Sequence, residues 1–426
     1  MNNRVRYVFY YPSSGIGGAQ LLFGRIAEAL INDGRRVLIV EENNSYISKY
    51  LGERKLEFDV VKVPESNHFS TTADDILVLP LSYVFLFRQF VDAAPETRLV
   101  FWDLHPHNLI ETTAFSKIYK EFPGGRLSSA ARLIERRHLH KINVFAAEAS
   151  SKQALYFMCL RNFSENKEFF KLGFDPIYLP IPIHVMETNN LSAKDFTTSE
   201  RPLKHGVIHV GWISRMDVDK LRILALLIED AIQFNKIHDD FKVLIHAIGD
   251  EKACNRALNK KNQLGDVLRL PGVLLGADLD AYLAENIDVG FSMGTAALEF
   301  ASRQVPTVLV PNTDWHKLFE KDRRRYFWLF DSHGYDVAVE NFHLESKARD
   351  FEAIISHFLR VEDDLGMKSY NYIMQNHSFN KVFKRFKELT NESALVMADL
   401  DNIGLYDSDN LQSFLLALKR FYKEMT

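Results

Sequence analysis

A chain of 426 residues is long enough for two or three domains with separate cores, and 46% hydrophobic with 25% charged residues is the composition of a globular protein. A formal net charge of −4 provides no strongly basic surface, so no nucleic-acid partner is expected. Cys159 and Cys254 lie far apart without the CxxC spacing of a zinc or redox site, which fits a reducing compartment.

The sequence predicts neither a secretory signal nor a membrane-spanning helix. Residues 1–11 pass directly into a short apolar run and lack the longer apolar core and cleavage site of a signal peptide. The longest apolar stretch, residues 76–91, contains Pro80 and Arg88 and falls short of the roughly 20 apolar residues that cross a bilayer. We predict a strand and then a helix there, and a cytoplasmic protein overall.

The first half of the chain alternates strands with helices. A β-branched and aromatic run over residues 5–11 predicts a strand, the glycine loop at residues 12–18 follows, and residues 19–33 have helical spacing that ends at Gly34. A strand over residues 35–41 completes a βαβ unit with a parallel sheet. Further strands are expected at residues 75–80, 99–102 and 142–146.

After a polar segment, the second half of the chain again alternates strands with helices. Strands are predicted at residues 206–211, 241–248, 267–270, 287–291 and 307–310, with helices over residues 218–234, 279–285 and 296–302. We expect an N-terminal Rossmann-like domain over residues 1–185, a linker over 186–203, a C-terminal Rossmann-like domain over 204–368, and a helical tail over 369–426 that packs partly on the first domain. Two doubly wound α/β domains of this kind form a cleft at the carboxyl ends of their sheets, where such folds bind ligands.

The glycine loop ahead of the first helix, with Gly17 and Gly18, lets backbone amides approach a ligand at a helix N-terminus. It matches neither the dinucleotide fingerprint nor the P-loop. A tight turn without a ligand is an equally good interpretation.

Two basic residues follow the first strand of the second half. Arg215 and Lys220 are five residues apart on a loop that enters a helix, so they can converge on a diphosphate. The alternative is an ordinary solvated helix start, although basic residues there oppose the helix dipole.

A second candidate phosphate element lies at Gly294 and Thr295, where a strand ends and a helix opens. Glu299 is one turn further along and is flanked by apolar residues, so its carboxylate can accept the hydroxyls of a ribose. The alternative is an exposed helix glutamate with no ligand.

Residues 101–107 place a carboxylate and two imidazoles at the end of a predicted strand. Asp103 is a candidate general base that takes a proton from an acceptor hydroxyl, and His105 is the nearest imidazole to it in the sequence. A metal site is a third interpretation, but one cluster without a second acidic element offers too few ligands, so we expect no metal.

These motifs resemble the GT-B glycosyltransferase group that includes the family-four retaining enzymes. The likeness covers most of residues 5–311 in order. It consists of GGAQ at residues 17–20, SRMDVDK at residues 214–220, a glycine turn at Gly249-Asp250, and GTAALE at residues 294–299. It implies that Arg215 and Lys220 bind a diphosphate, that Glu299 binds the ribose, and that His105 reaches the donor sugar.

Two positions depart from the pattern of that group. Ser214 replaces the usual glycine of the phosphate loop. Phe291 stands where the first glutamate of a Glu-x7-Glu element is expected, so the usual carboxylate contact with the donor sugar is missing. The donor sugar and the choice between a retaining and an inverting reaction are therefore open, with retention favoured by the resemblance.

Residues 126–141 (RLSSAARLIERRHLHK) are strongly basic and predict an amphipathic helix. Such a helix can lie on anionic lipid at the inner face of a membrane or receive an anionic, lipid-linked acceptor. A solvated helix face is the simpler alternative.

Together these features predict a metal-independent glycosyltransferase that moves a sugar from a nucleoside diphosphate sugar to a glycan or lipid-linked acceptor in polysaccharide or glycoconjugate synthesis. The alternatives are another GT-B enzyme, such as a sugar-nucleotide epimerase or hydrolase, and a noncatalytic protein that binds nucleotide sugar or glycan. Phe291 keeps the noncatalytic alternative open.

Overall fold

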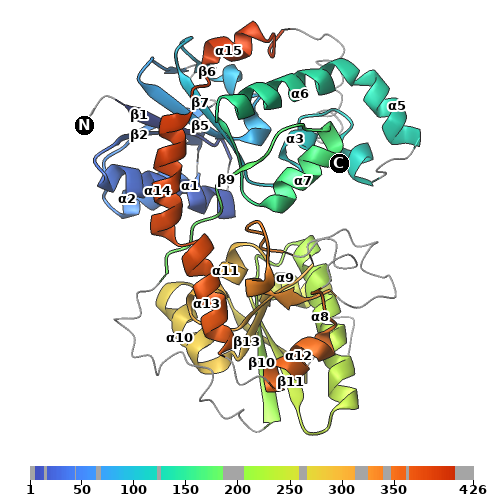
Figure 1. Cartoon of the computed structure of the whole chain (residues 1–426). Coiled ribbons are helices and arrows are strands. Elements are labelled where there is room, and N and C mark those ends of the chain that lie inside the picture. The colour runs from blue at the N-terminus through green and yellow to red at the C-terminus, as the bar shows by residue number, and fades with distance from the viewer. Residues whose placement is uncertain are drawn as a thin grey trace. The chain divides into compact units, whose positions relative to one another are not determined.

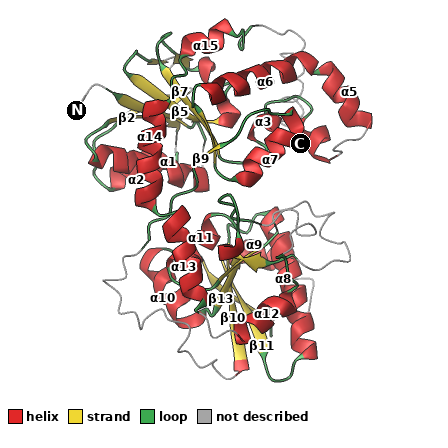
Figure 2. Ribbon diagram, viewed as in Figure 1, coloured by secondary structure: helices red, strands yellow, loops and turns green. Residues whose placement is uncertain are grey.

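The chain folds into two units, each built on its own β-sheet with helices on both faces (Figures 1 and 2). Unit 1 comprises residues 1–181 and 382–426, and unit 2 comprises residues 182–381. The computed structural model describes residues 5–13, 17–43, 45–63, 69–121, 126–185, 206–258, 266–311, 325–338, 347–360 and 364–407. The expected linker at residues 186–203 and the last part of the tail lie outside these ranges.

Unit 1 has a seven-stranded parallel sheet in the order β3-β2-β1-β5-β7-β8-β9. Because β1 lies between β2 and β5, the strand order reverses beside it, and open α/β sheets bind ligands at such a point. The elements are β1 (Arg6–Tyr10), α1 (Gly18–Asn32), β2 (Arg36–Glu42), α2 (Tyr46–Glu53), β3 (Asp59–Val63), β4 (Phe69–Ser70), β5 (Asp75–Pro80), η1 (Leu81–Tyr83), η2 (Phe87–Gln89), β6 (Val91–Asp92), β7 (Arg98–Asp103), α3 (Asn108–Glu111), α4 (Ser116–Glu121), α5 (Arg126–Ile134), α6 (Arg136–Ser151), β8 (Leu155–Phe157), α7 (Leu160–Phe170) and β9 (Ile177–Tyr178), followed near the end of the chain by α14 (Phe379–Glu392) and α15 (Met397–Asn402).

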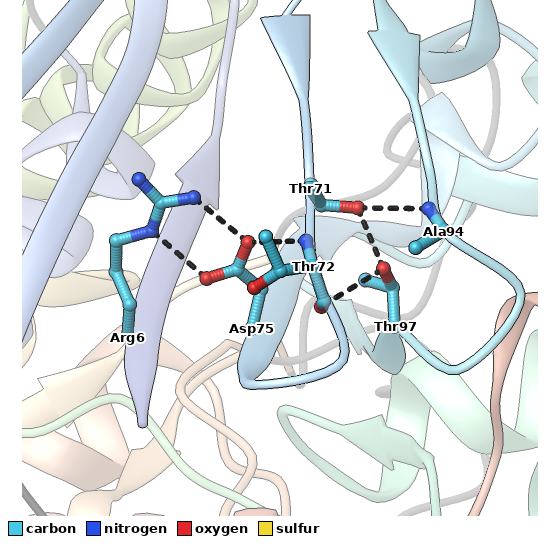
Figure 3. Close-up of polar contacts among 6 residues, drawn as sticks. All are labelled: Arg6, Thr71, Thr72, Asp75, Ala94 and Thr97. Atoms are coloured by element: carbon cyan, nitrogen blue, oxygen red, sulfur yellow. Dashed lines mark hydrogen bonds and ion pairs between the residues drawn. The ribbon is translucent and has the colours of Figure 1, made fainter. Parts of the chain in front are cut away.

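A buried ion pair ties the first residues of β1 and β5 together (Figure 3). Both carboxylate oxygens of Asp75 accept from the Arg6 guanidinium at 2.8 Å, and the Thr72 amide also donates to Asp75. This forked geometry suits a planar guanidinium and fixes the register of the two central strands. The hydroxyls of Thr71 and Thr97, 2.6 Å apart, connect the turn before β5 to the turn before β7.

The C-terminal part of the chain completes the core of unit 1. Phe386 of α14 lies beside the rings of Tyr7, Phe9 and Trp102 on one face of the sheet. On the opposite face, Phe101 meets Phe145 of α6 edge to face. Residues 382–407 of the tail therefore pack on unit 1, whereas residues 369–381, including most of α13, belong to unit 2.

Two sequence predictions in unit 1 are wrong. Residues 142–146 lie inside α6 rather than in a strand, because Ile142, Phe145, Ala146 and Ala149 face the core at helical spacing. The strand is β8, which begins at Leu155. The apolar stretch over residues 76–91 forms a strand as expected, but the 3₁₀ turns η1 and η2 replace the predicted helix.

Unit 2 has a six-stranded sheet in the order β12-β11-β10-β13-β14-β15, parallel except for β15. Its predicted strands and helices are confirmed with small shifts of their ends. The elements are β10 (Val207–Ile213), α8 (Val218–Ile237), β11 (Lys242–Ile248), α9 (Glu251–Leu258), β12 (Leu268–Gly272), α10 (Gly276–Asn286), β13 (Val289–Ser292), α11 (Thr295–Ser302), β14 (Thr307–Leu309), β15 (Phe327–Trp328), η7 (Leu329–Asp331), α12 (Phe351–Arg360) and α13 (Leu365–Asn376).

Two glycines bring α11 close to the sheet of unit 2. Gly211 of β10 and Gly290 of β13 are direct partners in the parallel register. A Cβ on either residue would collide with the ring of Phe300 on α11. The missing side chains therefore let Phe300 lie directly on the two strands, which positions the N-terminus of α11 at the carboxyl edge of the sheet.

None of the helices in the described ranges combines the length and apolar character needed to cross a bilayer.

Candidate functional site

The strand order of unit 2 reverses between β10 and β13. At such a switch point the loops that follow the two strands diverge to opposite faces and leave a crevice. The loop after β10 carries Ser214 to Asp217 and leads into α8 with Lys220, and the loop after β13 carries Met293 and Gly294. The predicted phosphate elements of the second half are therefore the two loops of this crevice.

Lys220 connects the segments that follow these two strands. It belongs to the first turn of α8, and its Nζ is 2.9 Å from the Sδ of Met293. A thioether is a weak acceptor and an ammonium has three donors, so this contact holds the charge in place without neutralising it. A cation from α8 thus reaches the residue that precedes Gly294.

The N-terminus of α11 is open. Gly294 has φ +62° and ψ −143°, a conformation that favours glycine, and a Cβ there would meet no atom within 4 Å. Among the described residues, no side chain caps the amides of Thr295 and Ala296, while the Gly294 amide donates to the Val337 carbonyl at 2.7 Å. Open amides beside an ammonium suit a phosphate.

Ser214 has a role of its own in the first loop. Its hydroxyl accepts from the indole of Trp212 at 3.0 Å and from the Met216 amide at 3.2 Å. Met216 is buried with φ +57°, an unusual conformation for a residue with a side chain, and the serine stabilises it. The departure from glycine at position 214 therefore has a structural explanation.

Gly249 supports the same loop from β11. A Cβ at Gly249, which has φ +157°, would collide with the backbone oxygen of Ser214. The glycine turn noted in the sequence thus lets two loops pack against each other. This packing fixes the backbone from which Arg215 and Lys220 project.

Arg215 is not brought to Lys220 in this structure. Its side chain is 68% exposed, and its Nη2 is 3.2 Å from the carboxylate of Asp217 on the same loop. An exposed ion pair of this kind is weak, so the guanidinium can turn toward a stronger anion. The structure therefore brings together Lys220, Gly294 and Thr295, with Arg215 three residues before the start of α8.

Glu299 is held by an ion-pair network on α11. Arg303 Nη1 donates to Glu299 Oε2 at 2.6 Å, and Arg303 Nε donates to Asp280 Oδ1 at 2.6 Å. Burial lowers the pKa of Arg303, but Glu299 and Asp280 outweigh it and raise that pKa above its usual value. Two carboxylates around one guanidinium leave a net negative charge, which keeps Glu299 an acceptor. Arg303 and Asp280 were not predicted, although the four-residue spacing of Glu299 and Arg303 is typical of a helix ion pair.

Phe291 faces the core. It is fully buried, with Tyr326 edge to face at 5.4 Å and Phe351 of α12 at 5.5 Å between ring centroids. Its neighbour Gly290 faces α11, as alternation along a strand requires. The aromatic residue at this position thus contributes to packing.

Gly17 and Gly18 open α1 at the reversal beside β1. Gly17 is the N-cap residue with an extended backbone, and no side chain caps the helix. The preceding residues 14–16 of the glycine loop lie outside the described ranges. Among the described residues of unit 1, the N-terminus of α1 therefore has no side-chain cap at the point where the strand order reverses.

Asp103 is fully buried at the end of β7. The Asn166 side chain donates to its Oδ2 at 2.9 Å, and the Asn162 side chain donates to its backbone oxygen at 2.9 Å. Burial raises the pKa of Asp103 well above its usual value, against smaller lowering effects of the His105 amide and the Asn108 side chain. No oxygen of Asp103 is open to an acceptor hydroxyl, and its contacts tie the β7 loop to α7.

His105 is exposed on that loop. Its Nδ1 accepts from the His107 amide at 3.2 Å, so the neutral ring carries its proton on Nε2. His107 in turn lies 3.4 Å from the carboxylate of Glu165. Asp103 thus anchors the loop from which His105 presents a hydrogen-bond donor.

Within the described ranges, no three His, Cys, Asp or Glu side chains gather as a metal site would require.

No protein-family model matches the sequence, and a search among curated proteins gave no significant match. Solved structures do match. The glycosyltransferase from Rickettsia africae is 12% identical with a TM-score of 0.53, over 92% of this chain and 99% of that chain.

Two further structures are similar over about nine-tenths of this chain. HepE of Anabaena, solved in complex with UDP, is 12% identical with a TM-score of 0.53, over 91% of this chain and 100% of that chain. A UDP-forming α,α-trehalose-phosphate synthase from Burkholderia xenovorans is 10% identical with a TM-score of 0.51, over 92% and 99%. At these identities the likeness establishes the fold. The chain has the GT-B fold of glycosyltransferases, with two Rossmann-like α/β domains and a helical C-terminal segment.

Proposed function

We propose that the protein is a glycosyltransferase whose second unit binds a nucleoside diphosphate sugar at the crevice between β10 and β13. The contact of Lys220 with Met293 carries this proposal, because it places an ammonium beside the open N-terminus of α11. The two groups together match the charge and the oxygens of a diphosphate. The similar structures include a glycosyltransferase and HepE in complex with UDP, which supports the same ligand class.

In the proposed complex, Lys220, Gly294 and Thr295 bind the diphosphate and Glu299 accepts the ribose hydroxyls. Arg215 leaves Asp217 and adds a forked contact to the phosphates. As the sugar departs, negative charge grows on the diphosphate, and fixed positive groups stabilise that transition state. Since these groups supply the positive charge, the proposal assigns the reaction no metal.

The residues of unit 1 serve the sugar and the acceptor. His105 offers its Nε2 proton to a hydroxyl or ring oxygen of the sugar, and Gly17 and Gly18 offer backbone amides. Because Asp103 is buried and favours its neutral form, we assign it to positioning this loop rather than to general base catalysis. An inverting reaction needs a general base that can reach the acceptor hydroxyl, and buried Asp103 does not offer one. The position of Asp103 therefore favours the retaining reaction.

The proposed acceptor is a glycan or a lipid-linked glycan, and the proposed setting is polysaccharide or glycoconjugate synthesis at the cytoplasmic face of a membrane. The basic segment over residues 126–141 supports an acceptor of this kind.

The first test is thermal stabilisation by UDP, GDP, dTDP and CMP, because a ligand of the folded form raises Tm by mass action. One nucleoside diphosphate should raise Tm at micromolar to millimolar concentrations. The matching nucleotide sugars are then incubated with and without acceptors, and the products are analysed for transferred sugar. If none of the four nucleotides raises Tm, the assignment of the crevice is wrong.

Phe291 favours a second candidate, a noncatalytic protein that binds a nucleotide sugar. Because its ring packs in the core, residue 291 does not supply the carboxylate that usually contacts the donor sugar. Binding of a nucleotide sugar without transfer or hydrolysis would support this candidate. Conversion of the sugar without an acceptor would instead indicate an epimerase or hydrolase.

A further inference from the structure

A group of exposed apolar side chains lies on one helix of unit 1. Leu127, Leu133 and Ile134 of α5 are 60%, 69% and 47% exposed. Leu127 and Ile134 are seven residues apart and share a side of the helix, and Leu133 lies on the adjacent side. We call these three side chains, together with Arg126, Arg136 and Arg137, the outer face of α5–α6. Most exposed apolar residues of proteins are single, so such a group indicates an interaction surface.

The inner face of the same helices is firmly packed. The carboxylate of Glu135, which is 2% exposed, accepts from the Ala114 amide at 2.7 Å and from the Tyr119 hydroxyl at 3.0 Å. Arg132 donates to the Phe169 carbonyl at 3.0 Å and lies 4.1 Å from that ring. The helix therefore has a defined orientation, and the exposure of the outer face follows from it.

The charge of this segment is opposite to that of the whole chain. Residues 126–141 contain five Lys and Arg residues and a single acidic one, Glu135, in a chain of net charge −4. Arg126, Arg136 and Arg137 are exposed, and none of them forms an ion pair with an acidic residue in the described ranges. The buried Glu135 is directed inward, so the outer face presents positive charge alone.

Apolar side chains among unpaired arginines match the chemistry of an anionic bilayer surface. Leucine and isoleucine enter the boundary of headgroups and acyl chains, while arginines bind lipid phosphates. A protein partner with an acidic, apolar groove has the same chemistry, and vesicle binding in the test below distinguishes the two. We propose that the outer face of α5–α6 docks the protein on an anionic membrane. This docking does not depend on the proposed reaction.

The test is cosedimentation of the full-length protein with vesicles of phosphatidylcholine, alone or mixed with phosphatidylglycerol. The protein should bind the anionic vesicles, and salt should release it because salt screens the arginines. Arg136→Ser with Arg137→Ser should weaken binding by about thirtyfold, from the attraction that each basic residue adds near an anionic surface. Leu133→Ser with Ile134→Ser should weaken it by about tenfold or more.

Matched controls remove equal numbers of exposed side chains elsewhere. Val273→Ser with Leu275→Ser removes two apolar side chains that are 66% and 75% exposed on unit 2. Lys384→Ser with Arg385→Ser removes two charges from α14, with side chains 79% and 47% exposed. Both control variants should bind vesicles like the unchanged protein, and all four should keep its Tm.

Three outcomes would overturn the inference. One is an unchanged protein that fails to bind anionic vesicles, and another is an equal loss of binding in the control variants. The third is a dimer in analytical ultracentrifugation that Leu133→Ser with Ile134→Ser converts to a monomer, without vesicle binding in either form. That result would assign the outer face to self-association.

Discussion

The ammonium of Lys220 lies 2.9 Å from the sulfur of Met293, so α8 contacts the loop that opens α11. The two elements begin 77 residues apart in the chain, at Val218 and Thr295, and each follows one of the two strands at the switch point. This contact is the geometric basis of the proposed diphosphate site.

Lys220→Ala should weaken binding of the preferred nucleoside diphosphate by about 2 kcal/mol, or about thirtyfold in Kd, because a charged hydrogen bond is lost. Lys220→Arg should retain part of this affinity. Lys236→Ala, at the last turn of α8, is the control and should have no effect. Calorimetry with the diphosphate and the monophosphate checks the assignment, since an equal loss for both would mean that Lys220 does not contact the second phosphate.

Glu299→Gln and Asp280→Asn form a matched pair, because each removes one carboxylate from Arg303. Both should lower Tm by similar amounts, but only Glu299→Gln should weaken nucleotide binding, by about tenfold. The 2′-deoxynucleotide provides the sharper measurement. It should bind more weakly than the ribonucleotide to the unchanged protein and equally well to the Glu299→Gln variant, and a preserved preference for ribose in that variant would contradict the role of Glu299.

Gly290→Ala should destabilise the protein by about 1–3 kcal/mol, because the new methyl group collides with the Phe300 ring. Adding Phe300→Leu should recover part of the loss, so that the double variant is more stable than the sum of the single changes predicts. Urea unfolding measures all three. Gly52→Ala, at an open position of α2, is the control and should be neutral or slightly stabilising. Strict additivity would show that Gly290 and Phe300 do not compete for space.

Asp103→Asn distinguishes a positioning residue from a catalytic base. Burial raises the pKa of Asp103, so the fold favours its neutral form, and stability present at acidic pH is lost as pH rises through the unfolded pKa of about 4. The amide removes this cost, so Asp103→Asn should match or exceed the unchanged protein in Tm at neutral pH and should keep substantial turnover. His105→Ala should lose turnover instead. A complete loss of turnover in a stable Asp103→Asn variant would restore Asp103 as the base.

The pH dependence of stability should contain a contribution from His246 of β11. Burial, His209 and Arg269 lower the pKa of His246 to about 4, and its ring lies 2.8 Å from His209 Nδ1 and 2.7 Å from the Tyr282 hydroxyl. The unfolded chain binds this proton first as pH falls below 6.5, so the unfolding free energy should decrease by on the order of 3 kcal/mol down to about pH 4. His246→Gln should flatten this part of the stability profile, whereas His238→Gln, at a more exposed histidine, should not. Parallel profiles for His246→Gln and the unchanged protein would contradict this assignment.

The sequence predicts the parallel α/β architecture well, because glycine loops, helix ends and short β-branched runs are local signals. Gly34, for example, ends α1 with φ +74° as expected. Residues 142–146 show where local signals fail, since an apolar run of that length fits a strand or a buried helix equally well, and only packing on Phe101 decides. The same limit applies to the site. Asp103 has the residue type of a base, but its burial depends on Asn162 and Asn166 of α7, which no spacing rule connects to β7.

The last elements of unit 1 come from residues beyond 381, which follow the entire sequence of unit 2. During synthesis, the ribosome therefore polymerises all of unit 2 before Phe386 exists to cover Tyr7, Phe9 and Trp102. The sequence of unit 2, residues 182–381, is therefore complete before that of unit 1. Until residues beyond 381 are added, the aromatic surface of the N-terminal residues stays uncovered. A nascent chain stalled before residue 382 would expose that surface, which makes it a natural target for chaperones and proteases.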